Sequence, residues 1–276
     1  MITTKIHAML DTFSPTEQKI ALYINSNKKD VRTMTSYELA EILGIGQSNI
    51  IRFSQKLGYK GFRDLQMNID VVEEPENKEI KESDTTEVVN SKIVQQYINI
   101  TKLTNNSNPP ELIDRCVNRI VHSKQIFVYG VGNSNLFAEY LANHLRKIGL
   151  YASSSTNSHA SYTTVANFCS QDLVILVSET GMTREIVKLA KISRKRNVPI
   201  IAITRATNNT LSQLANEVLT TYNDLSNSSL NAMTIRCSQL YIIDMLVLNI
   251  IKGNYKKYRS FIKESENLLD EDYFGK

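Results

Sequence analysis

A short polar segment between residues 178 and 183 has the composition of a phosphate-binding turn. Its polar and small residues are Ser178, Glu179, Thr180, Gly181 and Thr183. Glycine adopts backbone conformations that other residues resist, and hydroxyl groups can donate hydrogen bonds to phosphate oxygens. A helix that starts directly after this segment would add free backbone N–H groups and a positive dipole end, which attract anions. An ordinary strand-to-helix turn uses the same residue types, so the segment alone favours both interpretations equally.

The residues on either side of this segment predict a strand and a helix. Residues 173–177 form an unbroken apolar run that is typical of a strand buried on both faces. After Arg184, apolar residues recur at Ile186, Leu189 and Ala190, which is the pattern of an amphipathic helix. Thr183 immediately precedes this helix, so we expect its side chain to form the N-cap.

A second turn with similar properties, Gly130-Val131-Gly132-Asn133-Ser134, follows a predicted strand at residues 125–129. Two glycines before a helix are found in dinucleotide-binding loops, but the third glycine of that fingerprint is absent. No acidic residue stands about twenty residues later, so NAD binding is not predicted. In a parallel sheet both turns would lie at carboxyl ends of strands, where ligands bind. We therefore expect Gly132 and Ser134 to surround one phosphate together with the first turn.

Strands and helices alternate through the rest of the C-terminal region, which predicts a doubly wound parallel sheet flanked by helices, an α/β fold. Further strands are expected at residues 150–153, 199–204 and 217–221, the last of them at a sheet edge. The final helical region, from about residue 230, carries a long apolar stripe formed by Leu240, Ile243, Leu246, Val247 and Ile250. This stripe exceeds what a lone domain of this size must bury, so we predict a homodimer or higher homo-oligomer.

The first 72 residues have the pattern of a separate, all-α helix-turn-helix domain. Ser14 with Glu17 and Thr35 with Glu38 are spaced as capping boxes, and each pair precedes a short helical pattern. Gly-Ile-Gly at residues 44–46 breaks the second helix, and a third is expected from residue 47 to residue 57. Two short helices joined by a tight glycine turn are typical of DNA-binding proteins.

The predicted third helix leaves a polar face without acidic residues. Its side chains can reach base edges and phosphates, and they are Gln47, Ser48, Asn49, Arg52 and Lys56. In the loop that follows, Lys60 and Arg63 are placed to contact the DNA backbone. A helical hairpin with an ordinary solvated face is the alternative, but the acid-free face favours DNA binding.

Residues 73–87 differ abruptly from their neighbours, with seven acidic residues, two lysines and few apolar groups. Such a composition cannot build a core and predicts an interdomain linker. The expected organisation is therefore a DNA-binding domain over residues 1–72, an acidic linker over 73–87 and an α/β domain with C-terminal helices over 88–276.

Length and composition restrict the class of protein. The 276 residues are 42% apolar and 22% charged, which is ordinary for a soluble protein of two domains. The three cysteines lie far apart, without the spacing of a disulfide framework or a zinc site. The N-terminus lacks the apolar core of a signal peptide, and the most apolar stretch, residues 240–251, is too short to span a bilayer. We expect a cytoplasmic protein with no metal, cofactor or membrane partner.

Both predicted domains resemble those of one known family. Gly130-x-Gly132-x-Ser134, together with Ser178-x-Thr180-Gly181-x-Thr183-x-Glu185, resembles the sugar isomerase (SIS) domain, a phosphosugar-binding fold. The segment over residues 10–65 resembles the N-terminal DNA-binding domain of the RpiR family of bacterial regulators. The two resemblances occur in the order that this family has, and together they cover most of the chain.

The resemblance implies a sequence-specific transcriptional regulator of sugar or amino-sugar metabolism. Its affinity for a double-stranded DNA operator would respond to a sugar phosphate, and repression relieved by the ligand is the commoner arrangement. The resemblance also implies that Ser134, Ser178, Thr180 and Thr183 contact the phosphate. Thr180 stands where serine is commoner in this loop, and it keeps the hydroxyl group. Glu179 is less usual, and its carboxylate must point away from the phosphate or bind sugar hydroxyls.

Two other functions use the same features. A sugar-phosphate isomerase or lyase on the SIS fold would need a general base, and Glu179, Glu185 and His159 are the acidic or basic side chains near the predicted site. A constitutive DNA-binding protein would use the SIS domain only to dimerise. The attached DNA-binding domain argues against an enzyme, and titration with sugar phosphates would distinguish all three functions.

Overall fold

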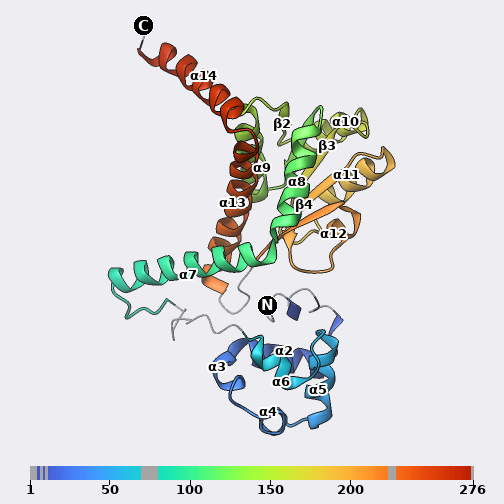
Figure 1. The fold of residues 1–276 in the computed structure, drawn as a ribbon, viewed down its shortest axis with the longest axis vertical. Coiled ribbons are helices and arrows are strands. Elements are labelled where there is room, and N and C mark those ends of the chain that lie inside the picture. The colour runs from blue at the N-terminus through green and yellow to red at the C-terminus, as the bar shows by residue number, and fades with distance from the viewer. Residues whose placement is uncertain (1–4, 7–8, 10–11, 70–79, 223–227, 275–276) are drawn as a thin grey trace. The chain divides into compact units, whose positions relative to one another are not determined.

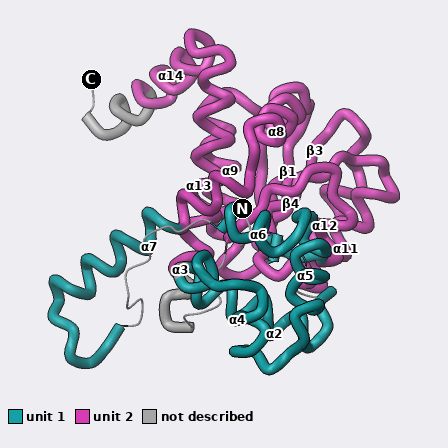
Figure 2. The backbone as a smooth tube through the Cα atoms, turned by 60° about the horizontal axis from the view of Figure 1, so that its bottom comes forward, with its two compact units in different colours: residues 1–99, 206–208, 224–231 teal, residues 100–205, 209–223, 232–276 magenta. Residues whose placement is uncertain are grey.

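The computed structural model describes residues 5–6, 9, 12–69, 80–222 and 228–274. The chain divides into two compact units, which Figure 2 shows in different colours. One comprises residues 1–99, 206–208 and 224–231, and the other comprises residues 100–205, 209–223 and 232–276. Residues 73–79 of the predicted linker lie outside the described residues, and its last two residues already belong to helix α7 (Thr86–Ser107).

The N-terminal unit is built from short helices (blue to cyan in Figure 1). Their bounds are α2 Pro15–Ser26, α3 Lys28–Val31, α4 Ser36–Leu43, α5 Gln47–Lys56 and α6 Phe62–Met67. Helices α2 and α4 begin at the two predicted capping boxes. The carboxylate of Glu17 accepts a hydrogen bond from the N–H of Ser14 at 2.7 Å, and that of Glu38 from Thr35 at 2.6 Å. Both capping boxes are confirmed.

The turn between α4 and α5 has the predicted geometry. Gly44 ends α4 with φ +62°, a left-handed conformation that glycine adopts without strain. Ala40, Ile50 and Phe53 are all buried where α4 and α5 pack together. The small side chain of Ala40 lets the two helices approach closely, so a helix-turn-helix forms as the sequence predicted.

The second unit contains a five-stranded sheet with strand order β2-β1-β3-β4-β5, in which every neighbouring pair is parallel. The strands are β1 Ile126–Gly130, β2 Ala152–Ser154, β3 Leu173–Val177, β4 Ile200–Arg205 and β5 Glu217–Thr221. Strand β3 is the predicted apolar run and is buried along its whole length. Strand β5 lies at the edge of the sheet, as expected.

Helices cover both faces of this sheet (Figure 1). On one face the core includes residues of α8 (Pro110–His122), α9 (Asn133–Lys147), α13 (Ser228–Gly253) and α14 (Tyr255–Phe274). On the other face it includes residues of α10 (Ser158–Ala166), α11 (Arg184–Lys195) and α12 (Thr210–Leu214). The doubly wound α/β fold is therefore confirmed. Helix α12 was not predicted, because its five residues are too few to show a periodic apolar pattern.

The predicted apolar stripe of α13 belongs mostly to the core of its own unit. Ile243, Leu246, Val247 and Ile250 are buried there, and only Leu240 is substantially exposed, at 39%. Most of the stripe is therefore used within its own unit, and Leu240 is the stripe residue left for a second subunit. Residues 233–253 are long and apolar enough, by length and composition, to cross a membrane. Part of this helix is buried in the core of its unit, and core helices are also apolar.

Asn108 lies between α7 and α8 but does not cap α8, which begins at Pro110 without a side-chain cap. The Asn108 amide instead donates to the carbonyl of Thr220 at 2.9 Å and accepts from the Thr220 N–H at 2.7 Å. These bonds satisfy the outer backbone groups of Thr220 on edge strand β5, which would otherwise be open to pairing with another strand.

Candidate ligand site and DNA-binding face

The two predicted phosphate-binding turns lie side by side at one edge of the sheet. Strands β1 and β3 are parallel neighbours, and Gly130 at the end of β1 pairs with Val177 at the end of β3. The next residues of both strands therefore leave the sheet together. Since β2 and β3 lie on opposite sides of β1, the strand order reverses at this point, and such a switch point is where ligands bind in open α/β sheets.

The turn after β1 has no room for a side chain at its first glycine. A Cβ atom at Gly130 would lie 2.4 Å from the carbonyl oxygen of Ser134. Gly132 has φ +59° and directly precedes α9, which has no side-chain cap. The Asn135 amide, with its nitrogen turned to the two acceptors, donates to the carbonyls of Gly130 at 3.2 Å and Ser155 at 3.1 Å. This side chain ties the turn to the loop after β2.

The turn after β3 brings two of the predicted hydroxyl groups together. Ser178 is 3% exposed, and its Oγ accepts a hydrogen bond from the N–H of Gly181 at 3.1 Å. The Ser178 Oγ and the Thr183 Oγ1 are 3.4 Å apart. The hydroxyl of Thr180 is instead used within the turn, where it accepts from the N–H of Met182 at 3.2 Å.

The expected side-chain cap of α11 is absent. Thr183 occupies the N-cap position, but its hydroxyl faces Ser178 and makes no capping bond. Helices α9 and α11 thus both begin at this edge without a side-chain cap. In α9 the N–H groups of Ser134 and Asn135 already donate to the carbonyls of Val131 and Gly132, at 3.2 and 3.0 Å, so the start of α11 is the better placed of the two to bind an anion. The arrangement is chemically suited to a phosphoryl group between the Ser134 turn and the Ser178–Thr183 turn.

Three residues whose role the sequence analysis did not identify hold the second turn, namely Thr204 and Arg205 at the end of β4 and Asn209 in the loop after it. The carbonyl of Glu179 accepts from the N–H of Arg205 at 3.1 Å and from the Thr204 hydroxyl at 3.3 Å. Asn209 packs directly on Gly181 and caps α12 through a capping box with Ser212. An Asn followed three residues later by Ser is a local signal for that cap, but it does not reveal the contact with Gly181.

Two tyrosines, Tyr129 on β1 and Tyr162 on α10, interact with each other and with Glu185 of α11. Burial raises the pKa of the Tyr129 phenol, and the neighbouring Tyr162 and Glu185 raise it further. Burial also raises the pKa of Tyr162, as does the charge of Glu185. The ammonium group of Lys188 lies 4.3 Å from the centre of the Tyr162 ring. Both phenols therefore stay neutral and able to donate hydrogen bonds at physiological pH.

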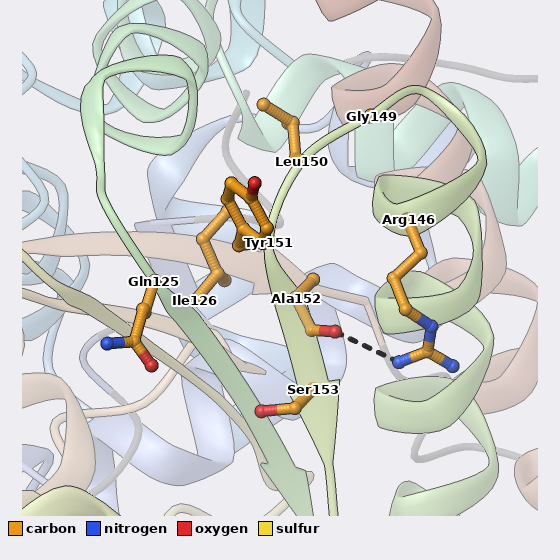
Figure 3. Close-up of a pocket in the computed structure, with 8 residues that line it drawn as sticks. All are labelled: Gln125, Ile126, Arg146, Gly149, Leu150, Tyr151, Ala152 and Ser153. Carbon is orange, nitrogen blue, oxygen red and sulfur yellow. Dashed lines mark hydrogen bonds between the residues drawn. The ribbon is translucent and has the colours of Figure 1, made fainter. Parts of the chain in front are cut away.

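A cavity of about 620 Å³ lies elsewhere on this unit (Figure 3). Figure 3 shows Gln125 and Ile126 near the start of β1, together with residues 149–153 leading into and along β2. Arg146 at its rim donates to the carbonyl of Ala152 at 3.0 Å. This cavity is at the amino ends of the strands, opposite the two turns, so it is not part of the candidate phosphate site.

The candidate DNA-binding face is only partly free. Ser48, Arg52, Lys60 and Arg63 are exposed and Asn49 is half-buried, but two predicted contacts are engaged inside the unit. Gln47 donates to the hydroxyl of Ser36 at 2.8 Å. Lys56 forms an ion pair with Glu17 at 2.8 Å. Partial burial raises the pKa of Glu17, but hydrogen bonds from Lys56 and Ser14 outweigh this and hold it below its ordinary value.

Lys60 and Arg63 line a groove of about 780 Å³ in the N-terminal unit. The groove also includes Ser36, at the start of α4, and Ile51, on α5. Two exposed cations beside the candidate recognition helix form a surface on which a DNA phosphate strand can rest.

We expect Arg52→Ala to weaken binding to a preferred DNA sequence by about 1–3 kcal/mol, because Arg52 is exposed on α5 and can reach a base edge. Lys60→Ala should weaken binding to all DNA sequences alike and reduce the salt dependence of binding, since a phosphate contact carries no sequence information. The measurement is a gel-shift series over several salt concentrations, with DNA selected by the parent protein from a random pool. Lys263→Ala, exposed in the other unit, is the control, and parental binding by both test variants would contradict the assignment.

In the described part of the chain, no group of three or more His, Cys, Asp or Glu residues is placed to hold a metal ion. The three cysteines are free, and burial raises the pKa of the Cys116 thiol to about 12.

Both parts of the chain are similar to known protein families. Residues 1–72 match the model of the helix-turn-helix domain of the rpiR family, and residues 119–249 match that of the SIS domain. An uncharacterised HTH-type transcriptional regulator of Escherichia coli, YfhH, is 28% identical over 96% of this chain and 97% of its own length.

Two solved structures share the fold. The Vibrio vulnificus NanR protein, complexed with ManNAc-6P, is 23% identical, with a TM-score of 0.61 over 98% of both chains. The sugar isomerase domain of an RpiR transcription factor from Sphaerobacter thermophilus is 22% identical, with a TM-score of 0.58, and matches 65% of this chain and 98% of that domain. The chain therefore belongs to the RpiR family of transcriptional regulators, with an N-terminal helix-turn-helix domain and a C-terminal SIS domain.

Proposed function

We propose that this regulator binds a DNA operator with an affinity that a sugar phosphate controls. It acts as a repressor of sugar or amino-sugar metabolism genes in the cytoplasm, and the ligand relieves repression. The proposed ligand residues are Gly132, Ser134, Ser178, Glu179, Thr180, Gly181 and Thr183. The proposed organisation keeps the DNA-binding domain at residues 1–72, the linker at 73–87 and the ligand domain at 88–276.

The observation that carries the proposal is the pairing of the two turns at the switch point of the sheet. Ser178 and Thr183 present hydroxyl groups 3.4 Å apart, next to two helix starts without side-chain caps. Hydroxyl groups and free N–H groups at helix N-termini are the groups that bind phosphate in proteins. The complex of the similar NanR protein with ManNAc-6P makes an amino-sugar phosphate the first ligand to test.

We infer binding without catalysis. The candidate general bases are the carboxylates of Glu179, in the turn after β3, and of half-buried Glu185, in the first turn of α11, and the imidazole of exposed His159 on α10. These three groups come from separate elements, and the proposal gives none of them the role of a general base. The attached helix-turn-helix domain gives the bound ligand another output, which is a change in DNA affinity.

We also propose that the protein works as a homodimer. Bacterial operators are commonly read as paired half-sites, and one small helix-turn-helix domain offers little contact area. Most of the α13 stripe is buried in the unit's own core, but its Leu240 is exposed. Leu136 and Tyr140 on α9 and Leu248 on α13 are also exposed apolar side chains.

Ser178→Ala and Thr183→Val are expected to lower sugar-phosphate affinity about tenfold or more. A hydrogen bond to a charged group contributes roughly 1.5–3 kcal/mol, and 1.4 kcal/mol corresponds to a factor of ten. DNA binding without ligand should be unchanged. The measurement is titration calorimetry with hexose, pentose and amino-sugar phosphates, including N-acetylmannosamine 6-phosphate, followed by DNA binding with and without the ligand that binds.

Ser153→Ala is the matched control, because this exposed serine lines the cavity of Figure 3 and lies outside the two turns. Linkage requires that DNA alter ligand affinity by the same factor as the ligand alters DNA affinity, and both can be measured. If no sugar phosphate changes the DNA affinity of the parent protein, the proposed switch is contradicted. A larger loss of sugar-phosphate affinity in Ser153→Ala than in Ser178→Ala would indicate that the ligand binds in the cavity.

A further inference from the structure

Gly181, in the middle of the candidate phosphate turn, lies against the side chain of Asn209. A Cβ atom at Gly181 would be 1.9 Å from the Asn209 Oδ1 and 2.2 Å from its Cγ. Gly181 also has φ +63°, so both its backbone conformation and its surroundings exclude a larger residue. The shape of the turn is therefore matched to an amide that is 28 residues further along the chain.

Asn209 cannot easily move away, because hydrogen bonds hold both ends of its amide. Its Oδ1 accepts from the N–H of Ser212 at 2.9 Å, and its Nδ2 donates to the Thr204 hydroxyl at 3.2 Å. The residue is only 4% exposed. A buried amide fixed at both ends is a rigid support for the glycine that rests on it.

Hydrogen bonds from the same region also hold two carbonyl groups of the turn. The Thr204 hydroxyl accepts from Asn209 and donates to the carbonyl of Glu179 at 3.3 Å. The N–H of Leu211, in the first turn of α12, donates to the carbonyl of Gly181 at 3.1 Å. Residues from the end of β4 and the start of α12 thus fix the backbone on either side of Thr180.

We propose that Asn209 is a positioning residue for the sugar-phosphate site. It supports Gly181 directly and Glu179 through Thr204, so that Ser178 and Thr183 are already aimed at the phosphate before it binds. This inference rests on the proposed function, because it concerns the residue that holds the same ligand site in its binding conformation. A preorganised turn binds more tightly than one that the ligand must order.

The test uses variants that separate support of the turn from capping of α12. Asn209→Ser keeps an N-cap hydroxyl, because serine and asparagine are comparable caps, but it loses the amide that reaches Gly181 and Thr204. Thr204→Val removes the hydroxyl between Asn209 and Glu179, whereas Thr204→Ser keeps it. Inorganic phosphate and the sugar phosphate found for the parent are titrated by calorimetry against each full-length variant.

We expect Asn209→Ser and Thr204→Val each to bind both ligands about tenfold more weakly, and Thr204→Ser to bind like the parent. The double variant Asn209→Ser/Thr204→Val should lose little more than either single variant, because both act through one connected network. If Asn209→Ser binds like the parent while Asn209→Ala is weak, only the cap matters and the inference is overturned.

Hydrogen exchange of the free protein gives a readout that needs no ligand. The N–H of Gly181, which is bonded to Ser178 Oγ, should exchange faster in Asn209→Ser than in the parent. Unchanged exchange in this turn would overturn the positioning role by itself. A parent that binds no phosphate compound, but whose turn is loosened by Asn209→Ser, would instead contradict the proposed function and leave the support of the turn established.

Discussion

Gly130→Ala is expected to lower the free energy of unfolding of the C-terminal unit by about 3 kcal/mol, the upper end of what overpacking usually costs. The new Cβ would lie 2.4 Å from the Ser134 carbonyl oxygen and 2.8 Å from the Asn135 nitrogen. Both are backbone atoms in the first turn of α9, so no rotation of a side chain can relieve the contact. The helix must move away from β1.

This displacement should also affect the ligand site, since α9 begins at the turn that carries Ser134. We expect calorimetric melting to show a fall of about 6–12 °C in the transition of the C-terminal unit, from the usual 2–4 °C per kcal/mol for a domain of this size. Sugar-phosphate binding should fall with it.

Gly253→Ala is the control for the first prediction. Gly253 is the last residue of α13, and a Cβ there meets nothing within 4 Å. Alanine is less destabilising than glycine in a helix, so this variant should melt at or slightly above the parental temperature. A Gly130→Ala protein that melts like Gly253→Ala would show that the packing of α9 on β1 is looser than described.

Gly181→Ala is expected to reduce sugar-phosphate affinity by at least about 100-fold, which corresponds to about 2.7 kcal/mol. A left-handed conformation costs an ordinary residue about 1–2 kcal/mol. The added Cβ must also displace Asn209, which its hydrogen bonds to Ser212 and Thr204 oppose. The turn should therefore change shape at the proposed phosphate site.

Two further variants separate these two costs. Gly44→Ala, in the N-terminal unit, has a similar φ of +62°, but its Cβ meets nothing within 4 Å, so it should destabilise its unit less than Gly181→Ala destabilises the other. Adding Asn209→Ser to Gly181→Ala removes the obstructing amide and should restore part of the lost melting temperature. Equal destabilisation by Gly44→Ala and Gly181→Ala, with no restoration by Asn209→Ser, would show that strain alone matters.

The sequence by itself determined the order and type of most elements. The apolar run of β3, the capping boxes at Ser14 and Thr35, and the glycine break at Gly44 all act within a few residues. Local patterns of this kind fix strands, helix starts and turns before any tertiary contact forms. The two glycine- and hydroxyl-bearing turns were also recognisable, because each directly follows a buried strand.

Only the tertiary structure decided how individual polar side chains are used. Thr183 faces Ser178 instead of capping α11, and Asn108 bonds strand β5 instead of starting α8. Lys56 pairs with Glu17, 39 residues earlier, which removes a cation from the candidate DNA-binding face. Such partners are set by how the elements pack, and spacing along the chain carries no signal for them.

The same reason explains the apolar stripe of α13 and the support of Gly181. An apolar helical stripe has the same sequence pattern whether it packs against its own sheet or against another subunit. In the structure this stripe packs against the β-strands of its own unit. Gly181 was recognised from the sequence as a turn residue with unusual backbone freedom. That its lack of a side chain is also required by a buried amide on the loop before α12 follows only from the fold, because parallel strands β3 and β4 bring those two loops together.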